Sequence, residues 1–237
     1  MAGRFAEKSV LIAGGTGALG RAIALAFLDE SANVVVTYRR QEEFAAFNKA
    51  ADGLSLEGHQ VDVTDEAAVR RLAEGLLAGR RRVDVLVNAV GGYAGGKSLW
   101  ETDSKTFDQM LSLNLRSGFV LCRVIVPLML KQGSGSIVNV SSRTAFDHAA
   151  GAAAYAASKA AAVAMIDSLA ADLKGKGVRV NSVLPGIIDT EANRMAMPKA
   201  DFTKWPKPEE IARVILFLCS DEAALIHGAA VPVYGNA

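Results

Sequence analysis

Short apolar runs alternate with longer segments of helical periodicity along the whole chain of 237 residues. We expect strands at about 9–13, 33–37, 56–62, 83–88, 136–141, 178–184 and 229–234, and the apolar run at 9–13 suits a buried parallel strand. The periodic segments predict helices at about 18–29, 41–51, 65–78, 104–130, 153–174 and 208–220. Strict alternation without a linker or repeat predicts one α/β domain over 1–237. Its core is a doubly wound, seven-stranded parallel sheet with helices on both faces.

A glycine-rich turn, Gly14 to Gly20, joins the first predicted strand directly to the first predicted helix. Glycines at such a turn let the backbone approach a pyrophosphate, which rests on the N-terminus of the helix. A tight connection without a ligand is the alternative. The flanking strand and helix favour a dinucleotide-binding turn.

Tyr155 and Lys159 lie four residues apart within a segment rich in helix-forming residues, so both face the same side of the predicted helix. An ordinary tyrosine has a pKa of about 10, and a nearby cation would lower it towards neutrality. Ser142, upstream, could hold a reacting oxygen by a hydrogen bond while a proton moves. A solvated surface pair is the alternative, because this short spacing arises by chance on many helices.

Several small motifs occur in a fixed order: Gly14-x-x-Gly17-x-x-Gly20, Asp62-Val63, Asn88-Ala-Val-Gly91, Asn114, Ser142, Tyr155-x-x-x-Lys159 and Pro185-Gly-x-x-x-Thr190. With these motifs the chain resembles the short-chain dehydrogenase/reductase family from end to end. The resemblance implies a Rossmann-type domain, a nicotinamide cofactor, and a catalytic group of Asn114, Ser142, Tyr155 and Lys159. The chain departs from the family pattern at Ala13, Ala18 and Ala89, which replace a Thr, a Gly and an Asn.

The resemblance also implies the residues that hold the cofactor. They are Gly14, Thr16, Gly17, Ala18, Leu19, Gly20, Arg39, Asp62, Val63, Asn88, Ala89, Gly91, Tyr155, Lys159, Pro185, Gly186, Ile188 and Thr190. Among them, Asp62 is similar to the residue that meets the adenine amino group, and Thr190 to the one that meets the nicotinamide carboxamide.

The residues after the second predicted strand bear on the choice between NADP and NAD. An acidic residue there would hydrogen-bond the ribose hydroxyls of NAD. The chain has Tyr38, Arg39 and Arg40 instead, and an arginine can bind a 2′-phosphate. We therefore expect NADP(H), with NAD also possible if these arginines are ordinary surface charges.

Two loops, 91–99 and 191–205, resemble those of quinoid dihydropteridine reductases, although that branch lacks a counterpart of Ser142. Tyr93, Met195, Met197 and Trp205 could form walls for a flat or apolar substrate. The alternative is a mobile lid closed on itself. We expect a carbonyl or alcohol substrate, with a pteridine reductase as one alternative and a non-catalytic dinucleotide-binding protein as another.

Composition narrows the remaining possibilities. A net charge of +1 gives no basis for binding nucleic acid or an anionic membrane, and Arg80-Arg81-Arg82 is interpreted as a solvated approach to a strand. No cysteine or histidine spacing predicts a metal site. With no signal-like N-terminus and no run of eighteen apolar residues, we expect a cytoplasmic protein. The apolar helices 104–130 and 153–174 predict a homo-oligomer, either a tetramer or a dimer.

Overall fold

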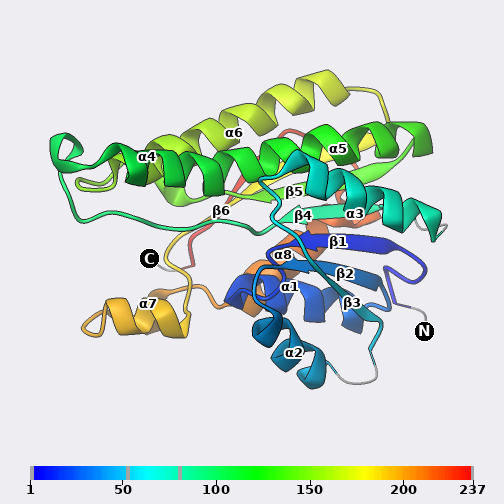
Figure 1. Ribbon diagram of the computed structural model, residues 1–237, viewed down its shortest axis with the longest axis horizontal. Helices are drawn as coiled ribbons and strands as arrows, with labels where there is room; N and C mark the ends of the chain where they lie inside the picture. The colour runs from blue at the N-terminus through cyan, green and yellow to red at the C-terminus, as the bar shows by residue number, and fades with distance from the viewer. Residues whose placement is uncertain (1–2, 52–53, 80–81, 236–237) are drawn as a thin grey trace.

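The computed structural model describes residues 3–51, 54–79 and 82–235. Arg80 and Arg81, whose role as a solvated approach was predicted, lie outside the described residues. Within the described part, one parallel sheet has the strand order β3-β2-β1-β4-β5-β6-β7 (Figure 1). The strands are β1 (Ser9–Ala13), β2 (Asn33–Tyr38), β3 (Leu56–Gln60), β4 (Val85–Asn88), β5 (Gly135–Val140), β6 (Val178–Pro185) and β7 (Ala230–Val233). The order reverses between β1 and β4, which is where a doubly wound sheet binds its ligand.

Helices cover both faces of this sheet. They are α1 (Ala18–Asp29), α2 (Gln41–Ala50), α3 (Glu66–Ala78), α4 (Ser104–Leu111), α5 (Ser117–Gln132), α6 (Ala153–Leu173), α7 (Glu191–Ala196) and α8 (Pro208–Cys219). In Figure 1, α3, α4, α5 and α6 lie on one side of the sheet, α1, α2 and α8 lie on the other, and α7 projects from the body. The predicted architecture is confirmed.

The two faces of each central strand feed two separate cores, which explains the continuous apolar runs in the sequence. Val10 and Ile12 of β1 pack into the core beneath α1 and α8, where Phe27 is fully buried. Leu11, on the opposite face, joins the core of α3, α5 and α6 with Ile125. Because both faces are covered, no polar alternation is seen in these strands.

One predicted helix proves to be three segments. The segment predicted as a single helix over 104–130 consists of α4, a π-helical segment at Ser112–Arg116, and α5. The loop predicted at 191–205 contains α7 and a 3₁₀ turn at Phe202–Lys204. π-helical segments commonly mark functional positions, and this one contains Asn114.

One helical run among the described residues is long enough to span a membrane. The 29-residue helical run Ser104–Gln132 has a mean hydropathy of 1.6 in its most apolar window, which is enough by length and composition to cross a bilayer. Half of that window is buried inside the domain, and α5 packs against α3, β4 and β5. We therefore interpret the run as a core helix of this domain.

Candidate active site and dinucleotide pocket

The glycine-rich turn brings α1 against the end of β1. Gly14 adopts a φ of +77°, which favours glycine, and a Cβ on Gly20 would lie 2.1 Å from the Gly14 carbonyl oxygen. Gly17, the N-cap of α1, has an ordinary φ of −69° and makes no side-chain cap. The positions of this turn that require glycine are therefore Gly14 and Gly20. The first N–H groups of α1 therefore remain free of a side-chain cap and can bind a phosphate.

Asn88 braces the sheet next to this turn. Its Nδ2 donates to Asn139 Oδ1 on β5 at 2.8 Å, and its Oδ1 accepts from the Val90 N–H at 3.2 Å. The Ala89 N–H donates to the Ala13 carbonyl at 3.0 Å, which ties the end of β4 to the end of β1. The substitution at Ala89 thus leaves the main bracing contact of this rim intact.

A cavity of about 200 Å³ lies at the carboxyl ends of β1, β2, β3 and β4. It is lined by eight of the predicted cofactor residues: Gly14, Thr16, Gly17, Arg39, Asp62, Val63, Ala89 and Gly91. Hydrogen bonds from the Thr64 main chain and hydroxyl lower the pKa of Asp62, so this carboxyl is an anion near neutral pH. Glu43, which sequence reasoning missed, also lines the cavity.

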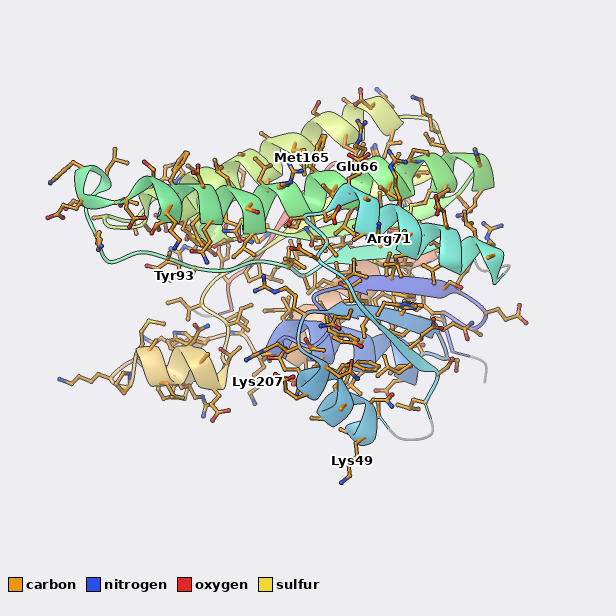
Figure 2. The ribbon with its side chains drawn as sticks, in the orientation of Figure 1. Lys49, Glu66, Arg71, Tyr93, Met165 and Lys207 are labelled. Carbon is orange, nitrogen blue, oxygen red and sulfur yellow. The ribbon has the colours of Figure 1, made fainter. Side chains whose placement is uncertain are left out.

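Two further predicted cofactor residues, Ala18 and Thr190, line a larger cavity of about 830 Å³ between α1, α7 and the start of α8. Figure 2 shows Lys207, another residue of its lining, between α7 and the body. Leu19, Gly20, Asn88, Tyr155, Lys159, Pro185, Gly186 and Ile188 line neither cavity. Most of the predicted set therefore gathers at one edge of the sheet, but its members do not all line the same pocket.

Ser142 and Tyr155 are brought together at the end of β5. Ser142 is buried, its Oγ accepts from the Thr144 N–H at 3.2 Å, and its side chain lies close enough to Tyr155, in the first turn of α6, to affect the pKa of that phenol. The pKa of Tyr155 is raised chiefly by burial, with the Ser142 hydrogen bond opposing the shift and Tyr93 adding to it. A serine beside a protonated phenol forms a pair that can hold and protonate a carbonyl oxygen.

The sequence predicts that Lys159 lowers the pKa of Tyr155, whereas in the described structure its amine is held by the backbone. Its Nζ donates to the Val140 carbonyl at 3.1 Å, and the side chain is 4% exposed. Burial lowers the pKa of Lys159 to about 8, and the causes that shift the Tyr155 pKa are burial, Ser142 and Tyr93. The hydrogen bond of the Lys159 amine thus goes to the main-chain carbonyl of Val140.

Asn114 fastens the loop after β4 to α6. Its Oδ1 accepts from the Gly92 N–H at 2.9 Å, while its Nδ2 donates to the Gly92 carbonyl and to Ser158 Oγ, each at 3.0 Å. Ser158 in turn donates to the Tyr155 carbonyl at 2.7 Å. A Cβ on Gly91 would lie 3.0 Å from Asn114 Oδ1 and 3.1 Å from Lys159 Nζ, so three elements converge there. Asn114 thus holds the loop after β4 in place against α6. The sequence motif does not predict its contact with Ser158.

The substrate side is open at Tyr93 and closed at Trp205. The ring of Tyr93 lies edge-on to that of Tyr155, with centroids 5.0 Å apart, and Tyr93 is 68% exposed. Figure 2 shows Tyr93 on the segment that leads from β4 to α4. Trp205 is buried and packs on Phe202, with their ring centroids 5.0 Å apart. Met195 on α7 is 75% exposed. Of these expected wall residues, Tyr93 therefore contacts Tyr155 and Trp205 packs within its own loop.

No group of three or more His, Cys, Asp or Glu side chains suited to a metal ion occurs among the described residues. Both cysteines are free thiols, and burial raises the pKa of Cys122 and of Cys219 to about 12. Thiolate chemistry near neutral pH is therefore disfavoured at both positions.

Comparison with known proteins gives a consistent result. The family model described as enoyl-(acyl carrier protein) reductase matches residues 14–235. The 3-oxoacyl-[acyl-carrier-protein] reductase FabG of Thermotoga maritima is 34% identical over 98% of this chain and 98% of its own length. A short-chain dehydrogenase/reductase structure from Burkholderia xenovorans superposes with a TM-score of 0.92 at 34% identity, covering 99% of this chain and 97% of the other. The structure of ElxO with NADP bound gives a TM-score of 0.90 at 27% identity, covering 96% and 97%.

Proposed function

Because the chain belongs to the short-chain dehydrogenase/reductase family and is an NAD(P)-dependent oxidoreductase, we propose that it interconverts a carbonyl and an alcohol with NADP(H). The observation that carries this proposal is that buried Ser142, at the end of β5, lies close enough to Tyr155 to lower its pKa, one helical turn from buried Lys159. A binding protein without catalysis would have no need of a protonated phenol held beside a buried serine. This pairing favours an enzyme.

The residues present suit a dinucleotide. The free N–H groups at the start of α1 would hold the pyrophosphate, and Asp62 in the 200 Å³ cavity would meet the adenine amino group. Thr190, which lines the 830 Å³ cavity, would meet the carboxamide. When bound, the nicotinamide would supply or accept the hydride.

The protein's own part in the reaction is to orient an oxygen and move a proton. Ser142 Oγ holds the substrate oxygen, and the Tyr155 hydroxyl donates its proton to that oxygen in reduction. Since burial raises the pKa of Tyr155, the phenol is in the protonated form that reduction needs. Lys159 would bind the nicotinamide ribose, and Asn114 keeps the Gly91–Gly92 backbone in place through its contacts with Gly92 and Ser158.

Arg39 supports the choice of NADP(H). It lines the same cavity as Asp62, and a guanidinium is suited to a phosphate. The related fold of ElxO holds NADP. NAD(H) remains the second cofactor of this proposal, because Arg39 is the single cation among the described residues that line the cavity.

We also propose that the chain forms a homodimer or homotetramer in the cytoplasm. Phe107 on α4 and Phe119 on α5 are 41% and 47% exposed, on the helical layer that sequence patterning predicts to pair between subunits. In a reducing compartment Cys122 and Cys219 would remain the free thiols that the structure shows. Light scattering tests the assembly: a monomer mass at micromolar concentration would contradict it.

The proposed activity is tested by following NADPH oxidation with a panel of ketones, quinones, 3-oxoacyl thioesters and quinonoid dihydropterin. Turnover of a ketone or a 3-oxoacyl thioester that is lost in Tyr155→Phe would support the proposal. Turnover of quinonoid dihydropterin alone would favour the pteridine alternative. No turnover of any member, together with intact binding of NADPH, would favour the non-catalytic alternative.

A further inference from the structure

A carboxylate sits in the pocket where the sequence predicts only arginines. Glu43, in the first turn of α2, lines the 200 Å³ cavity with Arg39 and Asp62. Among the described ionisable residues Arg, Lys, Asp and Glu that line it, there are therefore two carboxylates and one cation. The lining itself therefore holds one more negative than positive group, and Arg40 compensates Glu43 from outside it.

Glu43 is held in this place by contacts on both of its carboxylate oxygens. Its Oε2 accepts from Thr16 Oγ1 at 3.1 Å, and its Oε1 accepts a very short hydrogen bond from Arg40. Its main-chain carbonyl accepts from Arg21 at 3.2 Å, and Arg21 also donates to the Thr16 carbonyl at 2.8 Å. These contacts join the start of α2 to the glycine-rich turn.

The same contacts occupy groups that would otherwise favour a phosphate. Arg40 pairs with Glu43, and its side chain is 68% exposed and outside the cavity lining, so the pair partly compensates both charges and leaves Glu43 as the member that lines the cavity. The Thr16 hydroxyl donates its one proton to Glu43. In this arrangement it has no proton left to donate to a phosphate oxygen. Arg39 is left to hold a 2′-phosphate by itself.

We infer that Glu43 determines cofactor selectivity by opposing the 2′-phosphate, so that this chain accepts both NADP(H) and NAD(H) rather than NADP(H) alone. The inference rests on the proposed dinucleotide site and refines its preference. Like charges facing one another lower affinity, whereas a ribose hydroxyl can donate a hydrogen bond to a carboxylate. Glu43 therefore takes the part of the acidic residue that is absent from 38–40.

The test compares two ligands that differ by the 2′-phosphate, adenosine 2′,5′-bisphosphate and AMP, by calorimetric titration of the full chain. Glu43→Gln keeps the shape of the side chain and removes its charge. It should tighten the bisphosphate by about fivefold, the scale of a partly exposed charge interaction, and leave AMP unchanged or slightly weaker. The gain should shrink at high salt, because screening weakens charge interactions between exposed groups.

Glu42→Gln is the matched control. Glu42 is the preceding residue in the same first turn of α2, it is exposed, and it does not line the cavity. It removes the same charge from the same helix end and should leave both affinities unchanged. Equal gains in the two variants would mean a general effect of helix charge and would overturn the inference, as would an unchanged bisphosphate affinity in Glu43→Gln.

Arg39→Ala separates this inference from the proposed function. If Arg39→Ala weakens the bisphosphate while Glu43→Gln leaves it unchanged, the phosphate site stands and the role of Glu43 is wrong. If neither ligand binds to wild type or to any variant, the dinucleotide site itself is contradicted.

Discussion

The amine of Lys159 donates to the main-chain carbonyl of Val140 at 3.1 Å, within the interior of the domain. Val140 is the last residue of β5 and lies two positions before Ser142, so the lysine of α6 is anchored to the strand that leads to the serine. Burial lowers the pKa of this lysine from 10.5 to about 8. Burying the amine in its charged form therefore lowers the free energy of unfolding.

That cost depends on pH in a defined direction. Below the folded-state pKa of about 8, the amine is charged in the folded and unfolded states, and the full penalty is present. Between about 8 and 10.5 the folded state alone releases the proton, so the penalty fades as pH rises. The stability of wild type relative to Lys159→Met should therefore rise by up to about 3 kcal/mol from neutral pH to near 10.5.

Urea unfolding of the two proteins across that interval measures the difference. Lys174→Met is the control, since Lys174 is exposed at the C-terminal end of the same helix. A constant difference between wild type and Lys159→Met at every pH would show that the buried amine does not titrate as described.

The turn between β1 and α1 gives a second prediction. Gly20→Ala places a Cβ 2.1 Å from the Gly14 carbonyl oxygen, so either the turn or α1 must move. Binding of NADPH should weaken by at least about tenfold, because the N–H groups at the start of α1 lose their position. Fluorescence titration measures it.

Gly75→Ala is the matched control for this change, because a Cβ there meets nothing within 4 Å and Gly75 lies inside α3. It should leave binding unchanged and stabilise the fold by about 0.5–1 kcal/mol. If Gly20→Ala bound NADPH as tightly as wild type, the close approach of Gly20 to the Gly14 carbonyl would not be required for cofactor binding.

Most of the fold could be predicted from the sequence, because the central strands are buried apolar runs and the helices are either periodic or, like α6, rich in helix-forming residues. Asn114 shows the limit: the π-helical segment around it depends on contacts with Gly92 and Ser158, which lie far apart in the chain. Glu43 is a second case, since a helix N-terminal carboxylate is common and only its contact with Thr16 places it in the cavity. The effect of Lys159 on the pKa of Tyr155 stays a prediction, because helical spacing does not specify which acceptor a long side chain reaches.

Arg39 gives a third prediction, on affinity. Arg39→Ala should weaken NADPH by about tenfold or more and NADH little, because a charge-assisted hydrogen bond to the 2′-phosphate contributes about 1.5–3 kcal/mol. Parallel titrations with the two cofactors measure the effect. Equal losses for both would mean that Arg39 does not meet the phosphate.

The contact between Tyr93 and Tyr155 gives a fourth prediction. Tyr93→Ala removes the ring that faces the catalytic phenol at 5.0 Å and should raise KM for the substrate severalfold. Trp205→Ala opens a buried contact with Phe202 instead and should lower stability while changing KM less. Steady-state kinetics with thermal melts separates the two variants, and unchanged KM in Tyr93→Ala would place the substrate elsewhere.

The most direct test of the account is the turnover of Tyr155→Phe, measured beside its affinity for NADPH. The substitution removes the phenol oxygen whose pKa Ser142 lowers and leaves the ring beside Tyr93. The account predicts that kcat falls about a hundredfold or more, the scale of general acid catalysis, while NADPH affinity changes little. Turnover near that of wild type would contradict the assignment of Tyr155 as the proton donor.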